Sequence, residues 1–193
     1  MKPRELLDFL GAIETLKTNA RHSITRGGVP ETVAAHSWRM AVMALLVAPE
    51  VGDVDEDKLI RMCLIHDFGE AVTGDIPTFL KSADDEKTED DALARLLLQL
   101  PKAKRDDLEA LFSEMKDMQT REARLYKALD KLEAVIQHNE SDIATWIPIE
   151  YTLNLDYGME NAAEFPFLRE LRALMHADTQ RKIEEAKRTG EKG

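Results

Sequence analysis

The sequence predicts an all-α protein, an irregular helical bundle built as a single domain. Apolar residues recur at helical spacing through most of the chain. At 193 residues and 44% hydrophobic, the chain is long enough for one substantial core. No Gly/Ser-rich or Pro-rich stretch divides it, and no repeat of solenoid period is present. We therefore expect one domain over residues 1–193, with residues 181–193 as a charged, frayed tail.

The first half of the chain is expected to hold three helices. Leu6, Leu10, Ile13 and Leu16 share a face of the first, which leads into a loop over residues 19–30. Glu31 and Thr32 then introduce a helix that runs to about Val47. His36, Met40, Met43 and Val47 lie on one face of it, so the inward stripe of this helix contains a histidine.

A third helix is expected to end at the pair His66-Asp67. Pro49 and Gly52 break the chain before it, and its buried side carries Leu59, Met62, Cys63 and His66. Turns at Gly69, Gly74 and Pro77 follow. This loop is expected to bring Glu70 and Asp75 close to the end of the helix.

The second half is expected to be helical as well. An acidic helix start over residues 84–91 leads to a leucine-rich helix that Pro101 interrupts, and a shorter helix follows around residues 108–115. A long helix from about Thr120 carries Asp130 on one face with Tyr126, Glu133 and Gln137. Residues 145–161 alternate like a strand but have no partner strand in the pattern. A final helix begins at about Ala163.

Composition limits the class of function. The net charge of −11 argues against a nucleic-acid polymer as partner, because such binding depends on clustered Lys and Arg. A single cysteine, Cys63 between apolar neighbours, indicates a packed thiol in a reducing compartment, so we expect a cytoplasmic protein. The N-terminal stretch alternates charged and apolar residues, which fits neither a signal peptide nor a membrane span.

The pair His66-Asp67 is the strongest chemical signal in the chain. An imidazole and a carboxylate in apolar surroundings are costly to bury unless a cation or hydrogen bonds compensate. With His36 and Asp130, the pair supplies two nitrogens and two oxygens, enough to hold one divalent metal with open positions. Taken singly, His36 would be a hydrogen-bonded core histidine, and Asp130 a surface carboxylate paired with Lys127 or Lys131.

The order of these residues resembles the HD-domain metal-dependent phosphohydrolases. Within that superfamily, the 5′-deoxynucleotidase group is similar to the strings ETVAAHSWRMAVMA, LIHDFGEAVTGDIPT and KALDKLEAVIQ. The resemblance spans roughly residues 16–137, and the last fifty residues add little to it. It implies a helical bundle of the HD-domain type.

The resemblance also implies roles for individual residues. The metal ligands would be His36, His66, Asp67 and Asp130. Glu70 would be the general acid or base, Asp75 a catalytic or substrate-binding residue and Thr78 a substrate contact. Arg21 would bind the substrate phosphate, with Arg26 as its competitor for that role. The group often has a tryptophan just after this arginine, whereas here His22 or Ile24 must fill that space.

The function implied is hydrolysis of nucleoside 5′-monophosphates, deoxyribonucleotides in particular, to nucleoside and phosphate. One divalent ion would serve, with Mn²⁺, Co²⁺, Fe²⁺ and Zn²⁺ all suited to the ligands. Because the ligating imidazoles must be neutral, activity should collapse on acidification. Related enzymes are commonly dimers, and Trp146 could lie in the core or at an interface, of which we expect the core.

Three other functions fit parts of the pattern. An HD-domain hydrolase of another nucleotide phosphoester or pyrophosphate would use the same ligands. A non-catalytic, metal-dependent nucleotide-binding module would retain the ligands without turnover, although Glu70 argues against it. A di-iron oxygenase of this superfamily would need further histidines between Asp67 and Asp130, and the sequence has none there.

Overall fold

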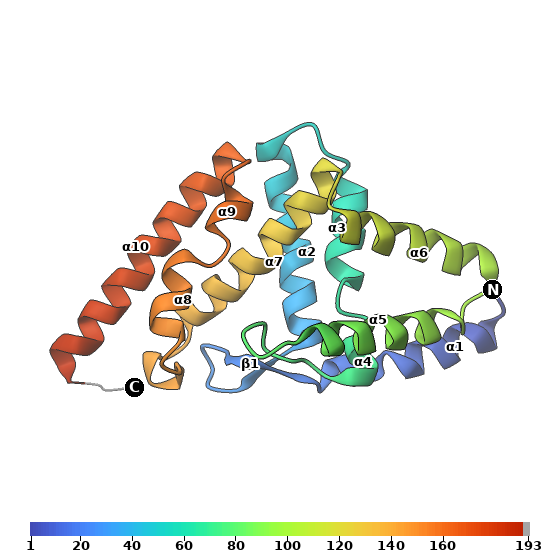
Figure 1. Cartoon of the computed structure of the whole chain (residues 1–193), viewed down its shortest axis with the longest axis horizontal. Helices are drawn as coiled ribbons and strands as arrows, with labels where there is room; N and C mark the ends of the chain where they lie inside the picture. Colours follow the sequence, from blue (N-terminus) through green and yellow to red (C-terminus); the bar gives the residue numbers. More distant parts are fainter. Residues whose placement is uncertain (191–193) are drawn as a thin grey trace.

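Helix α7 (Arg121–Glu140) is the central element of the protein, and helices from both halves of the chain pack against it (Figure 1). The computed structural model describes residues 1–190. Its elements are α1 (Pro3–Ala12), η1 (Glu14–Lys17), β1 (Ala20–Ile24), β2 (Pro30–Thr32), α2 (Val33–Val51), α3 (Glu56–Ile65), α4 (Glu70–Thr73), α5 (Ala83–Leu97), α6 (Lys102–Asp117), α7 (Arg121–Glu140), η2 (Ile143–Thr145), α8 (Glu150–Asp156), α9 (Met159–Ala162) and α10 (Pro166–Thr189). The predicted irregular helical bundle is confirmed.

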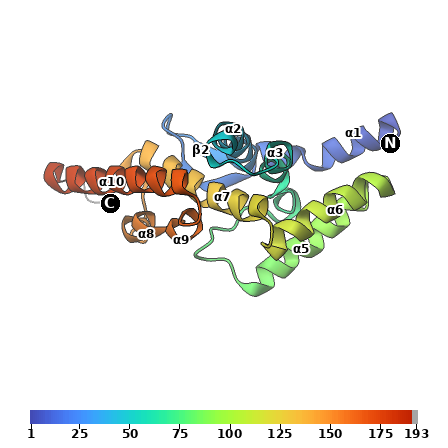
Figure 2. The same cartoon turned by 90° about the horizontal axis from the view of Figure 1, so that it is seen from above.

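The main core lies where α2, α3 and α10 meet α7. Leu125, Leu129 and Leu132 of α7 are fully buried there, together with Met40 of α2 and Leu59 of α3. Each such side chain stabilises the fold by about 1.5–3 kcal/mol through its removal from water. The molecule is elongated, with α10 at one end and α1, α5 and α6 toward the other (Figure 2). Packing on α7 therefore fixes α2 and α3 at the middle of the molecule.

Helix starts follow the capping chemistry of the sequence. Thr32 accepts a hydrogen bond from the backbone N–H of Ala35, as expected for the residue that introduces α2. Asp55, Ser82 and Thr120 cap α3, α5 and α7 in the same way. The break expected at Pro49 was wrong, because α2 continues through Pro49 to Val51, and Gly52 is its C-cap residue. Gly52 has a φ of 64°, a conformation that favours glycine.

The loop expected over residues 19–30 is instead a two-stranded antiparallel hairpin. Strands β1 and β2 pair Ala20 with Thr32 and Ile24 with Pro30. The Thr25 N–H donates to the Val29 carbonyl across the turn, and the Gln137 side chain donates to the Ile24 carbonyl at 2.7 Å. The hairpin is therefore fastened to α7, although its short strands lack the alternation that would have marked them in the sequence.

The segment over residues 145–161 forms η2, α8 and α9 and no strand, as predicted. Trp146 is only 3% exposed and packs in the core, as expected. Cys63 is a buried free thiol, also as expected. Helix α10 continues to Thr189 through most of the segment expected to be frayed, and residues 191–193 lie outside the described part. Among the helices of residues 1–190, none has the length and apolarity needed to cross a membrane.

Candidate active site

Four predicted metal ligands from three helices converge at the centre of the molecule. His36 lies on α2, His66 and Asp67 at the end of α3, and Asp130 on α7. His66 Nε2 lies 3.1 Å from Asp67 Oδ2, and His36 Nε2 lies 3.4 Å from Asp130 Oδ1. The same Asp130 oxygen is 3.9 Å from His66 Nε2. The structure thus brings together all four side chains that the sequence singled out.

The atoms that face one another in this cluster suit a divalent ion. His36 Nε2, His66 Nε2 and Asp67 Oδ2 are buried and have no hydrogen-bond partner. Buried polar atoms of this kind are costly unless they are paired, and an ion would pair all of them at once. Two imidazole nitrogens with two carboxylate oxygens form a donor set that suits first-row divalent ions.

The other nitrogen of each imidazole is already engaged. His36 Nδ1 bonds to Glu133, and His66 Nδ1 lies 2.9 Å from the Cys63 carbonyl. A hydrogen on each Nδ1 would leave both Nε2 atoms as acceptors, the tautomer that ligates metal. Asp130 Oδ2 accepts a hydrogen bond from Lys127 at 2.7 Å, so the predicted pairing with Lys127 coexists with its place in the cluster.

Glu133 is a supporting residue to which the sequence analysis gave no role. Its side chain is fully buried, and Arg39 binds its second oxygen while also donating to Gln137 at 2.7 Å. Burial alone would raise the pKa of Glu133, but His36 and Arg39 hold it below its ordinary value. The available signal was an acid three residues after Asp130, since residues three apart share a helix face.

Glu133→Gln is therefore expected to weaken metal binding by about 10–100-fold while leaving the ligands themselves in place. The neutral amide no longer favours the His36 tautomer that ligates metal. Isothermal titration of the metal-free protein with each ion measures this loss. An unchanged dissociation constant would show that Glu133 only supports the fold.

Electrostatics in the cluster favour charged carboxylates. Burial raises the pKa of Asp67, but His66, His36 and Arg21 outweigh burial and hold that pKa far below its ordinary value. Burial also raises the pKa of Asp130, but Lys127 and His36 outweigh burial and hold that pKa well below its ordinary value. Burial and Arg21 lower the pKa of His36, but Asp130 and Glu133 outweigh them and raise it to about 10. An ion entering the cluster must therefore displace a proton from His36.

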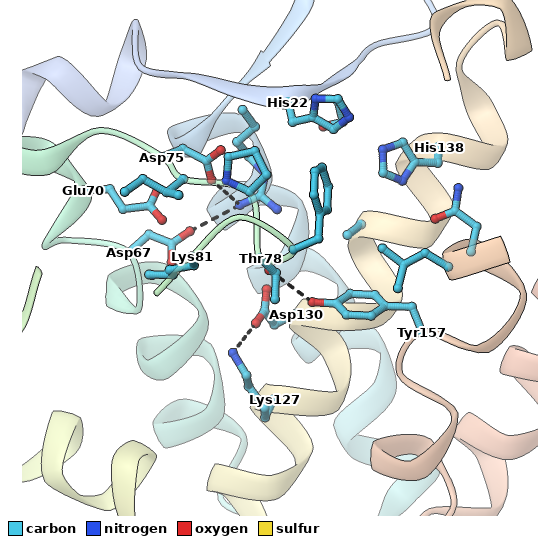
Figure 3. Close-up of a pocket in the computed structure, with 18 residues that line it drawn as sticks. His22, Asp67, Glu70, Asp75, Thr78, Lys81, Lys127, Asp130, His138 and Tyr157 are labelled. Atoms are coloured by element: carbon cyan, nitrogen blue, oxygen red, sulfur yellow. Dashed lines mark hydrogen bonds and ion pairs between the residues drawn. The ribbon is translucent and has the colours of Figure 1, made fainter. Parts of the chain in front are cut away.

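A cavity opens beside the cluster (Figure 3). Asp67 and Asp130 contribute to its wall, together with Glu70, Asp75 and Thr78 from the segment after α3. The elements around it are β1, the α4 region, α7 and α8. Glu70, Asp75, Thr78 and Arg21, four of the predicted catalytic or substrate-binding residues, therefore lie on this cavity.

Arg21 projects from β1 into the cavity among carboxylates. Its guanidinium lies 3.5 Å from Asp67, 3.8 Å from Asp75 and 3.3 Å from Glu31. Burial lowers the pKa of Arg21, but Asp67 and Asp75 raise it by more than burial lowers it, so the guanidinium stays charged. Arg26 instead has a 79% exposed side chain that lies 3.7 Å from Glu140, away from the lining residues. Only Arg21 of the two candidates faces the cluster.

Glu70 is buried beside the cavity and has a raised pKa. It is 4% exposed, and burial together with the charges of Asp67 and Asp75 raises its pKa to about 9. Its Oε2 atom has no hydrogen-bond partner. A Cβ at the preceding Gly69 would lie 2.7 Å from Glu89 Cγ, so only glycine lets α5 approach this closely. In the metal-free protein Glu70 therefore carries a proton at neutral pH.

A second polar cluster, which the sequence analysis missed, lies at the other end of the cavity. His22 Nε2 and His138 Nε2 lie 2.8 and 2.7 Å from the same oxygen of Glu150. His22 and Ile24 were the two residues expected to fill the space of the tryptophan that often follows the arginine. His22 lines the cavity, and Ile24 is not among the lining residues. His138 and His22 are 12 and 128 residues from Glu150 in the sequence, so no local pattern predicts this cluster.

Thr78, a predicted substrate contact, lies 3.4 Å from the Tyr157 hydroxyl.

The fold and the metal-ligand cluster define a helical metal-dependent phosphohydrolase. The structure of a predicted metal-dependent phosphohydrolase from Magnetospirillum magnetotacticum MS-1 matches with a TM-score of 0.79 at 29% identity, and covers 93% of each chain. A conserved hypothetical protein from Pyrococcus furiosus matches with a TM-score of 0.67 at 27% identity, over 90% of this chain and 99% of that one.

The chain belongs to the HD domain family, whose model matches residues 13–171. The 5′-deoxynucleotidase HDDC2 of Homo sapiens is 33% identical over 141 residues, which cover 71% of this chain and 68% of that protein. The 5′-deoxynucleotidase hdd1 of Schizosaccharomyces pombe is 26% identical over 144 residues, covering 70% and 72% of the two chains. The family resemblance stated from the motifs is thereby confirmed.

Proposed function

We propose that this protein hydrolyses nucleoside 5′-monophosphates, deoxyribonucleotides in particular, to nucleoside and phosphate. One observation carries the proposal: the cluster with three unpartnered ligand atoms adjoins, through Asp67 and Asp130, a cavity that also presents a buried arginine and a glutamate of raised pKa. A phosphate monoester needs this combination, because positive charge must stabilise its oxygens and a proton must reach its leaving group. Relatives named 5′-deoxynucleotidases support the choice of ester.

His36, His66, Asp67 and Asp130 would hold the ion. A divalent ion there would supply Lewis acidity and lower the pKa of a water molecule. Its identity among Mn²⁺, Co²⁺, Fe²⁺ and Zn²⁺ belongs to this proposal, since all four suit the donor set.

The chain's own residues would perform the remaining work. Arg21 binds phosphate oxygens through its planar guanidinium, which Glu31, Asp67 and Asp75 hold in position. Glu70 delivers a proton to the departing 5′ oxygen or orients the attacking water. Asp75 and Thr78 lie on the same wall and would hydrogen-bond water or sugar.

The proposal is tested by phosphate release from a panel of deoxy- and ribonucleoside 5′-monophosphates, cyclic nucleotides and nucleotide pyrophosphates. The protein is first stripped with chelator and then reloaded with each ion separately. Release from 5′-monophosphates alone supports the proposal, whereas release only from diesters or pyrophosphates would replace it. Nucleotide binding without any release of phosphate would instead favour the non-catalytic nucleotide-binding module.

Arg21→Ala is expected to raise KM for the nucleotide by about 10–100-fold, because a charge-assisted pair of hydrogen bonds to phosphate is lost. The matched change Arg26→Ala should alter KM less than twofold, since its side chain is exposed and outside the cavity. Steady-state kinetics on both variants decides the point. A larger effect at Arg26 would reverse the assignment.

Location and assembly complete the proposal. The packed thiol of Cys63 supports a cytoplasmic protein, because it fits a reducing compartment. A homodimer is proposed from the family resemblance, and sedimentation velocity would test it. The substrate would be a small nucleotide, in keeping with the net charge of −11, which opposes binding to a nucleic-acid polymer.

A further inference from the structure

The cluster of His22, His138 and Glu150 has no part in the chemistry described so far. His22 and His138 lie away from Glu70 and Asp67, across the cavity (Figure 3). Glu150 is 1% exposed, and its Oε2 accepts a hydrogen bond from the Ile147 backbone N–H at 2.7 Å. Its other oxygen contacts the two imidazoles. A buried carboxylate with this setting serves to orient the rings that it contacts.

The distances in this cluster are shorter than those between two ligands of one metal ion. His22 Nε2 makes a hydrogen bond to the Glu150 oxygen at 2.8 Å, and His138 Nε2 lies 2.7 Å from the same oxygen without the geometry of a hydrogen bond. Two ligands of one tetrahedral zinc ion, each about 2.0–2.1 Å from it, would lie about 3.3 Å apart. The corresponding distances in the His36 cluster are 3.1–3.9 Å. The two clusters therefore serve different purposes.

Glu150 fixes which nitrogen of each imidazole carries the hydrogen. Burial opposes its ionisation, but His138 and the Ile147 N–H outweigh it and lower the pKa of Glu150. A carboxylate favours hydrogen on the nitrogen that faces it, here Nε2 of both rings. The Nδ1 atom of His138 is then a hydrogen-bond acceptor, and it is buried without a hydrogen-bond partner, as is Nε2 of the same ring.

Asn154 supplies the complementary donor. Its side chain is 1% exposed, lines the same cavity, and has an Nδ2 with no hydrogen-bond partner. A buried amide donor and a buried imidazole acceptor left unpaired cost about 1–3 kcal/mol each. A ligand that both donates and accepts would satisfy the two atoms together.

Apolar groups complete this end of the cavity. Phe79 and Leu153 line it, and the Phe79 ring meets His22 edge-on with centroids 5.6 Å apart. Flat apolar walls beside a few polar atoms suit a planar ring with a polar edge. His22 directly follows Arg21 on β1, so this end lies next to the proposed phosphate contact.

We propose that His138 and Asn154, oriented by Glu150, form a nucleobase subsite that distinguishes nucleotides from simple sugar phosphates. Each base presents neighbouring donors and acceptors along its hydrogen-bonding edge, which match Asn154 Nδ2 and His138 Nδ1. Phe79 and His22 cover the ring. The inference rests on the proposed function, because it takes the phosphate to lie beside Arg21.

The test compares two esters that differ only in the base, a deoxynucleoside 5′-monophosphate and 2-deoxyribose 5-phosphate. Asn154→Leu, close in volume but without the donor, is expected to lower kcat/KM for the nucleotide about tenfold, mainly through KM. The value for deoxyribose phosphate should fall several-fold less. Asn161→Leu, outside this cavity, is the matched control and should change neither ester.

A pair of substitutions at His138 separates its two nitrogens. His138→Asn retains a polar atom near Nδ1, whereas His138→Gln retains one near Nε2, so the asparagine variant should keep more of the preference for the nucleotide. Melting temperatures and metal content of each variant show whether the fold survives. Metal content falling from two equivalents to one in His138→Gln would overturn the inference in favour of a second ion.

Two further outcomes separate this inference from the proposed function. Equal losses on both esters in Asn154→Leu would remove the base subsite and leave the hydrolase intact. If the metal-loaded wild-type protein hydrolyses neither ester, the proposed function fails, and calorimetric binding of the nucleotide decides the subsite alone. Binding that Asn154→Leu weakens about tenfold supports the subsite, and binding that it leaves unchanged overturns it.

Discussion

Asp130→Asn is expected to abolish phosphate release, by roughly 10³-fold or more, and to reduce bound metal to well below one ion per chain. The substitution keeps the size of the side chain but removes the charge that faces both imidazoles. Metal analysis of the purified protein, together with phosphate release under saturating ion, measures both losses.

The matched control is Asp107→Asn on α6, an exposed carboxylate that pairs with Arg61. It should retain full activity and metal content, because a surface ion pair contributes little. A variant at Asp130 that kept one tightly bound ion and normal turnover would remove this residue from the site.

Metal binding should also depend steeply on pH. The pKa of His36 in the metal-free protein is raised to about 10, so this imidazole is protonated below that pH and an ion must displace the proton. The apparent affinity should therefore fall as pH falls, which agrees in direction with the predicted loss of activity on acidification. Titrations in buffers of different ionisation enthalpy would count the protons released.

Glu70→Gln is expected to lower kcat by about 10²–10⁴-fold while one ion remains bound. The amide keeps the shape of the side chain but supplies no transferable proton. Glu109→Gln, at an exposed position on α6, is the matched control. Unchanged turnover in Glu70→Gln would remove Glu70 from the chemistry.

The same substitution should stabilise the metal-free protein. Because the pKa of Glu70 rises from 4.5 to about 9 on folding, the folded state binds this proton more tightly than the unfolded state. Its contribution to the free energy of unfolding is therefore present at low pH and lost as pH rises toward 9. Glu70→Gln lacks that loss and should be about 1–3 kcal/mol more stable than the wild type near pH 8. Thermal unfolding at pH 6 and pH 8 would show the difference growing with pH.

The sequence predicted the elements whose pattern is local. Helical spacing of leucines marked α7, and Thr32 marked the start of α2. The four proposed metal ligands could be picked out because each lies in a short motif on one of three helices. Their convergence was not visible in any one segment, since it arises from the packing of α2 and α3 on α7.

What the sequence did not reveal depends on contacts between distant segments. The hairpin has short, charged strands, and the bond from Gln137 to Ile24 fastens it across more than a hundred residues. Glu133 looked like one of several helix acids until its contact with His36 was seen. His22, His138 and Glu150 come from β1, α7 and α8, and no spacing rule joins them.

Inserted residues are expected to be tolerated in the turn of the hairpin but not in its first strand. Its turn over residues 25–29 is largely exposed and contains Gly28 at a φ of 78°, so extra residues there would project into solvent. One extra residue within β1 would instead reverse the facing of every following side chain up to the turn. A peptide tag or fluorophore placed in the turn would thus report on ligand entry from a few residues away, without altering the wall that carries Arg21.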